Sequence, residues 1–442
     1  MIYFYRLIAL PLMLLASPYF IGRKLRRDGL LEDWKQRFGF LPKLPKKNQT
    51  SLDKTKGKKR IWIQAVSIGE ILAIETLIDQ LMETEQVEII LTTTTSTGYQ
   101  AAKERYDKKI KLVGLFPIDF WIFSKIAWSR LQPDCILLAE SELWPEHLAQ
   151  ASKNKTPVFI INARLSNSSF KRLKAFKPFA HFLFSNVKTI YSATQIDFDR
   201  FIALGVKPDS IIGNIKLDVP FPYPLSEEEK HECINKLFLI TEKVKEKEFI
   251  LIGASTWPGE EALLLSAQKA CIKAGIDCRL IIVPRHVERK ASIIKLLKEQ
   301  KLKWILASDI ELAALEKHNA AIFLSDKTGN LSKLIRLADL AFIGKSMPPN
   351  RGGQTPIEAV AQGVPIITGP NMSNFANIID DLKSVSAGIQ IPDSNLFSEK
   401  IIELAQDPKK RKDLAQSGIE WHKSKKGISN YISKAIIASL EN

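Results

Sequence analysis

Short apolar runs recur through the first half of the chain, separated by amphipathic stretches of helical length. The runs are IWIQAV (61–66), VEIILTTTT (87–95), IKLVGLF (110–116), CILLAES (135–141), PVFIINA (157–163) and TIYSAT (189–194). Continuous β-branched and apolar runs are typical of parallel strands that are buried on both faces. The pattern therefore predicts an α/β fold with a parallel sheet covered by helices on each side.

The alternation stops at GNIKLDVPFPYPLSEEEK (213–230), where three prolines oppose helix and ladder pairing. A second series follows: FILIGAS (249–255), CRLIIVPR (278–285), WILAS (304–308), AIFLSD (321–326), LAFIGKS (340–346) and VPIITGP (364–370). A chain of 442 residues exceeds the size of one core. We therefore predict two doubly wound, Rossmann-like domains, 23–218 and 219–442, facing across a ligand-binding cleft. Whether the last helix packs back on the first domain stays open.

Residues 1–22 are almost wholly apolar apart from Arg6, and basic residues follow them at 23–27. About 20 apolar residues suffice to cross a bilayer, and basic residues favour the cytoplasmic side. We therefore expect a membrane anchor helix, with the rest of the chain in the cytoplasm. A signal peptide is the weaker alternative, because most of the charge follows the apolar run. Arg6 and Pro11 leave an interfacial anchor nearly as plausible as a full crossing.

The net charge of +16 predicts an anionic partner: nucleic acid, an anionic membrane surface or a phosphorylated substrate. No nucleic-acid-binding motif accompanies the charge, which argues against nucleic acid. The four cysteines have no C-x-x-C spacing and the six histidines have no ligand spacing, so we predict neither a disulfide framework nor a metal site. The basic linker 42–60 and the basic, aromatic segment 170–179 suit a lipid surface, although a solvated helix face explains the latter equally well.

Strand-to-helix loops of the second half offer candidates for binding an anion. In GASTWPGEE (253–261), Ser255 and Thr256 either cap the following helix or present their backbone amides to an anion at its N-terminus. Pro258 falls in the first turn of that helix. Arg285 follows a buried strand, where it could bind a phosphate or form a surface ion pair. In RGGQTPIEA (351–359), a glycine pair permits close approach to a ligand, and T-x-x-E predicts a capping box. The carboxylate of that box is also placed to bind a ribose.

In the first half, AVSIGE (65–70) joins a strand to a helix, and its S-x-x-E spacing predicts a capping box between Ser67 and Glu70. The alternative is that Glu70 points into the cleft as a catalytic group, and spacing alone does not decide between the two. Glu140, Glu142 and Arg164 follow two further predicted strands.

Taken together, these loops resemble the 3-deoxy-D-manno-octulosonic acid (Kdo) transferases of lipopolysaccharide biosynthesis. The resemblance is collinear over nearly the whole chain: the apolar N-terminus, AVSIGE, ESELWP, NARLS, GNIKLD, STWPGEE, VPRHVER, DKTGNLSKLIRLADLAFIGKS, RGGQTPIEA and GVPIITGP. It implies a GT-B glycosyltransferase of the inner membrane that transfers Kdo from CMP-Kdo to a lipid A precursor (lipid IVA) with inversion.

The resemblance also implies roles for particular residues. Glu70 matches the general base, and Glu142 and Arg164 match acceptor-side positions. The donor CMP-Kdo is expected to be bound without a metal or other cofactor. The expected donor-binding residues are Ser255, Thr256, Arg285, Gly352, Gly353 and Glu358.

The chain departs from the family pattern at Gln64 and Trp257, where histidine is usual, and at Lys345, which interrupts a usual Gly-Gly. These changes bear on the nucleotide contacts and on the acceptor. The alternative is a GT-B transferase that uses a UDP-sugar on another membrane glycolipid.

Overall fold

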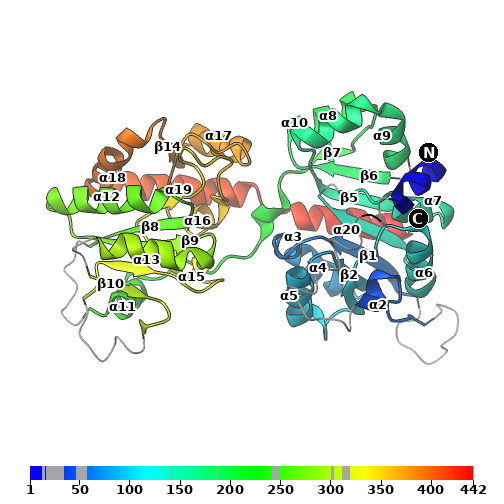
Figure 1. Cartoon of the computed structure of the whole chain (residues 1–442), viewed down its shortest axis with the longest axis horizontal. Coiled ribbons are helices and arrows are strands. Elements are labelled where there is room, and N and C mark those ends of the chain that lie inside the picture. The colour runs from blue at the N-terminus through cyan, green and yellow to red at the C-terminus, as the bar shows by residue number, and fades with distance from the viewer. Residues whose placement is uncertain are drawn as a thin grey trace. The chain divides into compact units, whose positions relative to one another are not determined.

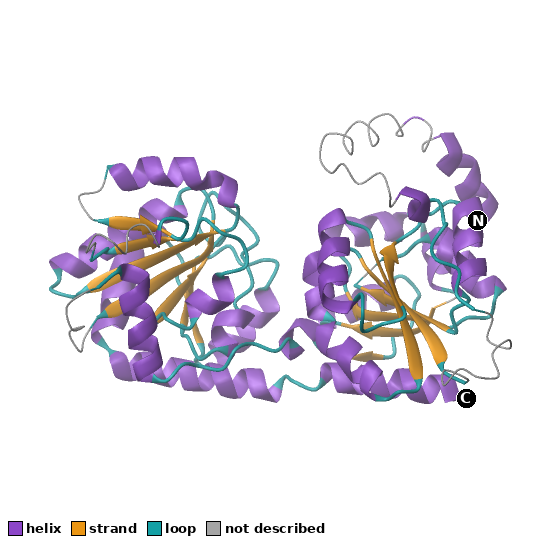
Figure 2. Cartoon of the chain, turned by 90° about the horizontal axis from the view of Figure 1, so that it is seen from below, coloured by secondary structure: helices purple, strands orange, loops and turns teal. Residues whose placement is uncertain are grey.

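The computed structural model describes residues 1–11, 15, 34–45, 57–140, 142–185, 187–240, 248–299, 303–310 and 319–441. The chain forms two compact units (Figure 1). Unit 1 contains Met1–Val219 together with Gly427–Asn442, and unit 2 contains Pro220–Lys426. Each unit is built on one parallel sheet with helices on both faces (Figure 2), which confirms the predicted pair of doubly wound α/β domains.

The sheet of unit 1 has the strand order β3-β2-β1-β4-β5-β6-β7. Its strands are β1 (Lys59–Ala65), β2 (Val87–Thr93), β3 (Leu112–Leu115), β4 (Cys135–Ala139), β5 (Val158–Ala163), β6 (Val187–Ser192) and β7 (Ser210–Ile211). Its helices are α2 (Trp34–Arg37), α3 (Ile68–Ala73), α4 (Glu75–Glu83), α5 (Ser96–Tyr106), α6 (Trp121–Leu131), α7 (Pro145–Lys153), α8 (Asn167–Ala175), α9 (Lys177–Phe184), α10 (Gln195–Ala203), the short 3₁₀ helix η1 (Ile215–Asp218) and α20 (Ile428–Glu441).

The sheet of unit 2 has the order β10-β11-β9-β8-β12-β13-β14. Its strands are β8 (Phe249–Thr256), β9 (Cys278–Pro284), β10 (Trp304–Leu306), β11 (Ile322–Leu324), β12 (Leu340–Ile343), β13 (Ile366–Thr368) and β14 (Gly388–Gln390). Its helices are α11 (Glu227–Phe238), α12 (Glu260–Lys273), η2 (Val287–Arg289), α13 (Lys290–Lys298), α15 (Leu331–Ile335), α16 (Ile357–Ala361), α17 (Ala376–Ser384), η3 (Ser394–Leu396), α18 (Phe397–Gln406) and α19 (Pro408–Ser424).

The predicted apolar runs form all the inner strands, which are covered on two faces, and one edge strand of each sheet, β3 and β10. Every residue of β2, β4 and β9 is buried. The edge strands on the opposite sides of the two sheets, β7 and β14, were not predicted, because each has two or three residues and no apolar run.

An aromatic cluster fills one side of the unit 1 core. The ring of Trp62 lies 5.8 Å from that of Trp128 and 5.4 Å from that of His147, and Phe116 lies 4.4 Å from His147. Burial lowers the pKa of His147 to about 3, so this histidine is neutral and belongs to the core.

Asp218 fixes the start of the returning helix α20 on unit 1. Its carboxylate accepts hydrogen bonds from the backbone N–H groups of Gly427, at 2.8 Å, and Ser429. Its own carbonyl accepts a bond of 2.8 Å from the hydroxyl of Thr76 in α4. These contacts join the end of η1 to both α4 and α20.

Replacing Asp218 by Ala is expected to lower the free energy of unfolding of unit 1 by about 1–3 kcal/mol, because the N–H groups of Gly427 and of the buried Ser429 lose their acceptor. Urea unfolding monitored by circular dichroism measures the change. The exposed Asp107, at the end of α5, offers a control: Asp107→Ala should leave the transition in place. Equal transitions for the two variants would contradict this role of Asp218.

The predicted anchor of residues 1–22 is described only in part. Residues 2–11 are helical and lie against unit 1, and most of residues 12–33 fall outside the described residues, as does most of the predicted basic linker. Among the helices that the structure describes, none has the length and apolar character needed to cross a bilayer.

Candidate functional site

Glu70 lies in the first turn of α3, at the carboxyl end of β1. Its carboxylate accepts a bond of 2.8 Å from the N–H of Val66 and one of 3.1 Å from the hydroxyl of Ser67. The Ser67 side chain makes no bond to the helix backbone, so the predicted reciprocal capping box is not formed. The carboxylate bends back to the chain as a capping residue does. Two accepted bonds leave its oxygens capacity for more, and the residue is only half-buried.

Two further carboxylates and a lysine surround Glu70. Glu140 and Glu142 follow β4, which pairs with β1, and Lys216 comes from η1. The ammonium of Lys216 lies 3.3 Å from the carboxylate of Glu140. Burial and the charge of Glu140 raise the pKa of Glu70. Its two hydrogen bonds and the charge of Lys216 oppose this rise. Burial and the charges of Glu70 and Glu140 raise the pKa of Glu142 to about 7. The Glu142 carboxyl can therefore hold a proton near neutral pH.

Replacing Glu142 by Gln is expected to stabilise unit 1 above neutral pH. A raised carboxyl pKa means that the folded state binds the proton more tightly, so stability falls as pH rises from the unfolded pKa through about 7. The gain at pH about 8 should be about 1 kcal/mol after solvent screening, and it should vanish near pH 4. Urea unfolding at both pH values measures it. A variant destabilised at both would contradict the raised pKa.

Arg164 and Gln64 also lie at the carboxyl ends of strands of this sheet. Arg164 follows β5, the neighbour of β4, and is half-buried. Gln64 is fully buried in β1, where its side chain accepts a bond of 2.7 Å from Thr92 and donates one of 2.9 Å to Thr94. Gln64 is therefore part of the link between β1 and β2.

In unit 2, the loop after β8 differs from the prediction. β8 extends through Thr256, and α12 begins only at Glu260, with Gly259 as the N-cap at φ 91°. The placing of Ser255 and Thr256 as caps of this helix was wrong, because the Trp257–Gly259 turn separates them from it. Thr256 is fully buried and its hydroxyl donates to Glu261 at 2.7 Å, whereas Ser255 is half-buried and adopts φ 57°.

Glu260 holds the loop that follows β12. Its carboxylate accepts backbone N–H groups of Lys345, at 2.8 Å, Ser346, at 2.9 Å, and Met347, at 3.1 Å. It also accepts the N–H of Trp257 at 2.8 Å, and it is 1% exposed. The loops after β8 and β12 are thus tied together by one carboxylate.

Two arginines follow β9 and have different surroundings. Arg289 donates to both oxygens of Glu261, at 2.8 and 2.9 Å, and to the carbonyl of Thr256 at 3.2 Å. Arg285, the predicted phosphate-binding residue, is exposed at the carboxyl end of β9, next to β8. Arg289 is therefore structural, and Arg285 can reach a ligand.

The glycine pair adopts a conformation that favours glycine. Gly352 has φ 107° and Gly353 φ 73°, and a Cβ on Gly353 would lie 2.3 Å from the sulfur of Met372. Their N–H groups, however, donate to the carbonyls of Asn371 and Lys345, at 3.1 and 3.0 Å. The glycine pair therefore shapes the loop, and its two backbone N–H groups already donate hydrogen bonds to backbone carbonyls.

Glu358 lies in the first turn of α16. The predicted T-x-x-E capping box was wrong, because Pro356 occupies the N-cap and no side chain caps the helix. Burial raises the pKa of Glu358, and a hydrogen bond with Ser332 opposes the rise. Its carboxylate is thus not used in the predicted cap.

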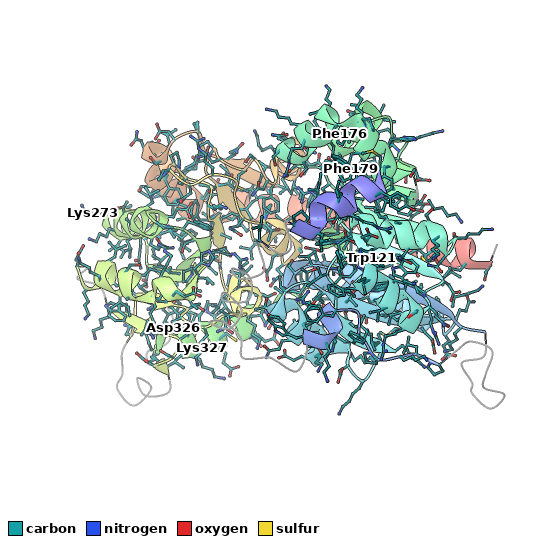
Figure 3. All side chains as sticks on the ribbon, turned by 45° about the vertical axis from the view of Figure 1, so that its right-hand side comes forward. Trp121, Phe176, Phe179, Lys273, Asp326 and Lys327 are labelled. Carbon is teal, nitrogen blue, oxygen red and sulfur yellow. The ribbon has the colours of Figure 1, made fainter. Side chains whose placement is uncertain are left out.

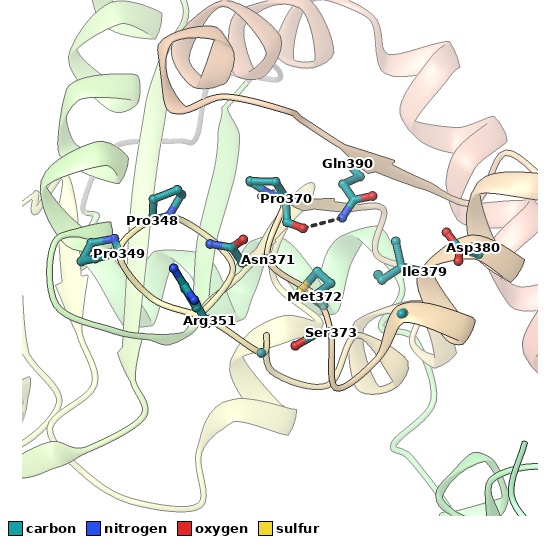
Figure 4. A pocket seen from close by; sticks show the side chains of 12 residues that line it. Pro348, Pro349, Arg351, Pro370, Asn371, Met372, Ser373, Ile379, Asp380 and Gln390 are labelled. Carbon is teal, nitrogen blue, oxygen red and sulfur yellow. Dashed lines mark hydrogen bonds between the residues drawn. The ribbon is translucent and has the colours of Figure 1, made fainter. Parts of the chain in front are cut away.

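A pocket of about 680 Å³ opens beside the glycine pair (Figure 4). Its polar lining residues are Arg351, Asn371, Ser373, Asp380 and Gln390, and Pro348, Pro349, Gly352, Pro370, Met372, Ala376 and Ile379 complete the wall. Of the predicted donor-binding residues, Gly352 lines this pocket, and Gly353 follows it in the loop after β12. Ser255, Thr256 and Arg285 lie at the carboxyl ends of β8 and β9, and Glu358 lies at the start of α16.

Trp257 and Lys345, two positions at which the chain departs from the family pattern, contact each other. The Lys345 ammonium lies 4.4 Å from the centre of the Trp257 ring, which also packs edge-on against His286 at 5.3 Å. The two changes therefore form one cation–π contact between the loops after β8 and β12.

Sequence reasoning missed the roles of Lys216 and Glu260. Lys216 lies in GNIKLD, one of the collinear motifs, so a signal was present; Glu260 looked like an ordinary first-turn acid. Within the described ranges, no group of three His, Cys, Asp or Glu side chains is arranged to hold a metal ion.

The comparisons identify the family. Residues 32–219 match the family model described as 3-deoxy-D-manno-octulosonic-acid transferase (Kdo transferase), and residues 245–421 match glycosyl transferases group 1. A 3-deoxy-D-manno-octulosonic acid transferase of Rickettsia bellii is 31% identical over 355 residues, covering 80% of this chain and 81% of that protein. One of Haemophilus influenzae is 30% identical over 364 residues, covering 81% and 82%.

A solved structure supports the fold. Anabaena HepE in complex with UDP has a TM-score of 0.58 at 14% identity, covering 87% of this chain and 99% of that one. The resemblance to the Kdo transferases is confirmed by the family model and by these relatives, and the chain belongs to the Kdo transferase family of glycosyltransferases.

Proposed function

We propose that this protein transfers Kdo from CMP-Kdo to a lipid A precursor, lipid IVA, with inversion at the anomeric carbon. Family membership supports Kdo transfer in lipopolysaccharide synthesis. The observation that carries the catalytic part is the Glu70 carboxylate at the carboxyl end of β1, whose pKa is raised by burial and by the charge of Glu140. A base whose pKa is closer to the working pH accepts a proton more effectively.

The proposed step is a single displacement. Glu70 accepts the proton of an acceptor hydroxyl while that oxygen bonds to the anomeric carbon of Kdo. The bond between this carbon and the phosphate oxygen breaks, and its electron pair leaves with CMP. Attack opposite the leaving group inverts the configuration. Glu142 and Arg164 remain proposed as acceptor-side residues.

The proposed donor site lies at the carboxyl ends of β8, β9 and β12. Arg285 is exposed there and is suited to the phosphate of CMP. Glu358, free of the predicted cap, is proposed to bind the ribose hydroxyls. Ser255, Gly352 and Gly353 would set the backbone near the nucleotide, and the hydroxyl of Thr256, bonded to Glu261, would act by positioning that backbone.

Mass spectrometry of a defined reaction tests the proposal. Purified protein is incubated with CMP-Kdo and tetraacylated lipid A precursor, and the product is expected to gain the mass of one or more Kdo residues. The number of additions is read from the same spectrum. Parallel reactions contain UDP-sugars in place of CMP-Kdo. Transfer from a UDP-sugar alone would reject the Kdo assignment in favour of the alternative transferase.

We also propose that catalysis needs no metal ion or other cofactor. The leaving group is a nucleoside monophosphate, and a guanidinium such as that of Arg285 can offset its charge. Transfer is therefore expected to continue unchanged after treatment with excess EDTA, measured as initial rate. Loss of the rate on chelation, with recovery on adding Mg²⁺ but not Na⁺, would contradict metal independence.

Because the proposed acceptor is a membrane lipid, we propose that the reaction takes place at the inner membrane. We propose that the catalytic units face the cytoplasm, where a CMP-sugar is available, and that the net charge of +16 favours the anionic membrane surface. Nucleic acid is not proposed as a partner. Fractionation of cells followed by protease treatment of intact spheroplasts tests this localisation.

A further inference from the structure

Lys345 occupies a backbone position that suits glycine better than lysine. It follows β12, is half-buried and has φ 60°, a left-handed conformation that glycine adopts without strain. The backbone here is held without the lysine side chain: Glu260 accepts the N–H of Lys345 at 2.8 Å, and the carbonyl accepts the N–H of Gly353 at 3.0 Å. The loop therefore does not need the lysine side chain for its shape, and that side chain extends from a fixed point.

The ring of Trp257 supports the Lys345 ammonium. The ammonium lies 4.4 Å from the ring centre, and the ring packs edge-on against His286 at 5.3 Å. Within the described ranges, Lys345 forms no ion pair with a carboxylate. An ammonium has three N–H donors, and an aromatic face attracts it without supplying the acceptors that a carboxylate would. The ammonium is therefore held in place with donors left for a ligand.

The acidic groups nearest in the chain are not available to neutralise this cation. Glu260 is 1% exposed and accepts four backbone N–H groups. Glu261 accepts both bonds of the bidentate arginine pair described above. Glu288 is exposed in η2, and residues 344–356 contain no aspartate or glutamate. The loop of Lys345 is thus a positively charged part of the candidate donor site.

A second cation, Arg285, belongs to the neighbouring loop on the other side of β8. β9 and β12 are the two strands that flank β8, so the loops of Arg285 and Lys345 begin about 10 Å apart, which is two strand spacings. Two long side chains from loops at this separation can contact one phosphate group. A guanidinium can bind two of its oxygens, and an ammonium can bind another. Trp257 follows the strand between them.

We propose that Lys345 binds the phosphate of the donor sugar nucleotide together with Arg285, and that Trp257 positions the ammonium for this contact. The inference deepens the proposed function, because it rests on the donor being bound at the carboxyl ends of β8, β9 and β12. When the bond between the phosphate oxygen and the anomeric carbon breaks, the departing phosphate gains one negative charge. The Lys345 ammonium offsets that charge without having to be recruited during the reaction.

Binding of CMP and of cytidine by the full chain tests the proposal, because the two ligands differ only in the phosphate. Lys345→Gly suits φ 60° and should remain folded, which thermal unfolding checks. Ligand-observed NMR titration should show that this variant loses affinity for CMP by about tenfold or more, the usual effect of one charge-assisted contact, and binds cytidine as wild type. Lys345→Arg keeps the charge and should retain most of the affinity for CMP.

Lys273 provides the matched control. It is an exposed lysine of the same unit, in the last turn of α12, at the end of that helix away from the β8 loop (Figure 3). Lys273→Ala should bind both ligands as wild type. Unchanged affinity of Lys345→Gly for CMP would overturn the proposal. Equal losses of affinity for CMP and cytidine would also overturn it, because they would show that Lys345 only maintains the loop.

The part assigned to Trp257 has its own test. Trp257→Leu should weaken CMP binding several fold in the wild-type chain and should add little in the Lys345→Gly background, because the ring acts through the ammonium. Cytidine binding should not change in either background. A loss of cytidine affinity in Trp257→Leu would show that the ring contacts the base, and would overturn the positioning role.

The proposed function is tested apart from this contact. Absence of Kdo transfer by a wild-type protein whose CMP binding depends on Lys345 would reject the proposed function and leave the phosphate contact standing. Kdo transfer by the wild type, with Lys345→Gly equal to it in CMP affinity and in rate, would overturn the phosphate contact alone.

Discussion

Replacing Glu70 by Gln is expected to lower the rate of sugar transfer by about 10²- to 10⁴-fold, the usual contribution of a general base. Gln keeps a side-chain oxygen that can accept the Val66 N–H, so the local fold of α3 should persist. It cannot accept the proton of an acceptor hydroxyl. Initial rates with CMP-Kdo and lipid acceptor, together with thermal unfolding, measure both effects.

Glu75 offers a matched control for this prediction. It also lies in the first turn of a helix of unit 1, in α4, and pairs with Arg105 at 3.8 Å. Glu75→Gln should transfer at the wild-type rate. If Glu70→Gln also transfers at that rate, Glu70 is only a capping residue and the catalytic proposal fails.

The pH profile of the wild-type enzyme gives an independent test of the same residue. The base must be ionised, and burial with the neighbouring Glu140 raises the pKa of Glu70. The acidic limb of kcat/KM should therefore lie above the ordinary glutamate range. Glu140→Gln removes one negative charge and should move that limb to lower pH. A limb that does not move would show that Glu140 does not affect the base.

Replacing Glu260 by Ala is expected to destabilise unit 2 by about 3 kcal/mol or more. Four backbone N–H groups from two loops lose their shared acceptor in a site that is 1% exposed. Glu260→Gln retains one accepting oxygen and should have an intermediate effect. Urea unfolding monitored by fluorescence measures the free energy of unfolding.

The effect of this change should extend to donor binding, because Lys345–Met347 lead into the loop that carries Gly352 and ends at α16, where Glu358 lies. Calorimetric titration with CMP is expected to show weaker binding for Glu260→Ala. The control is Glu288→Ala, an exposed acid in η2 of the same unit, which should change neither quantity. A Glu260→Ala protein as stable as the control would contradict the structural role of this carboxylate.

Hydrophobic pattern determined the strands because a parallel sheet buries both faces of each inner strand. Six runs in each half became β1–β6 and β8–β13, including the edge strands β3 and β10, whose residues are also mostly buried. The returning helix α20 shows the limit of such reasoning. Its sequence predicts a helix, but tertiary contacts assign it to unit 1: Asp218 binds Gly427 and Ser429, and the ring of Tyr191 in β6 packs on Tyr431.

Loops were harder to predict than strands because a short motif is compatible with several local structures. S-x-x-E at Ser67 and T-x-x-E at Thr355 both predicted capping boxes, and neither formed completely. At Thr355, Pro356 takes the N-cap. At Ser67, the hydroxyl donates to Glu70 instead of accepting from the helix.

The sequence by itself determined the two α/β domains, the family and the strand ends at which the candidate residues lie, because these depend on local pattern and on motif order. Only the tertiary structure decided which distant groups meet: Glu70 with Glu140 and Lys216, Glu260 with the loop at Lys345, and Arg6 with Glu146. The physical reason is that a buried charged group needs a partner close to it. Which group lies close depends on how distant segments pack, and sequence spacing does not specify that packing.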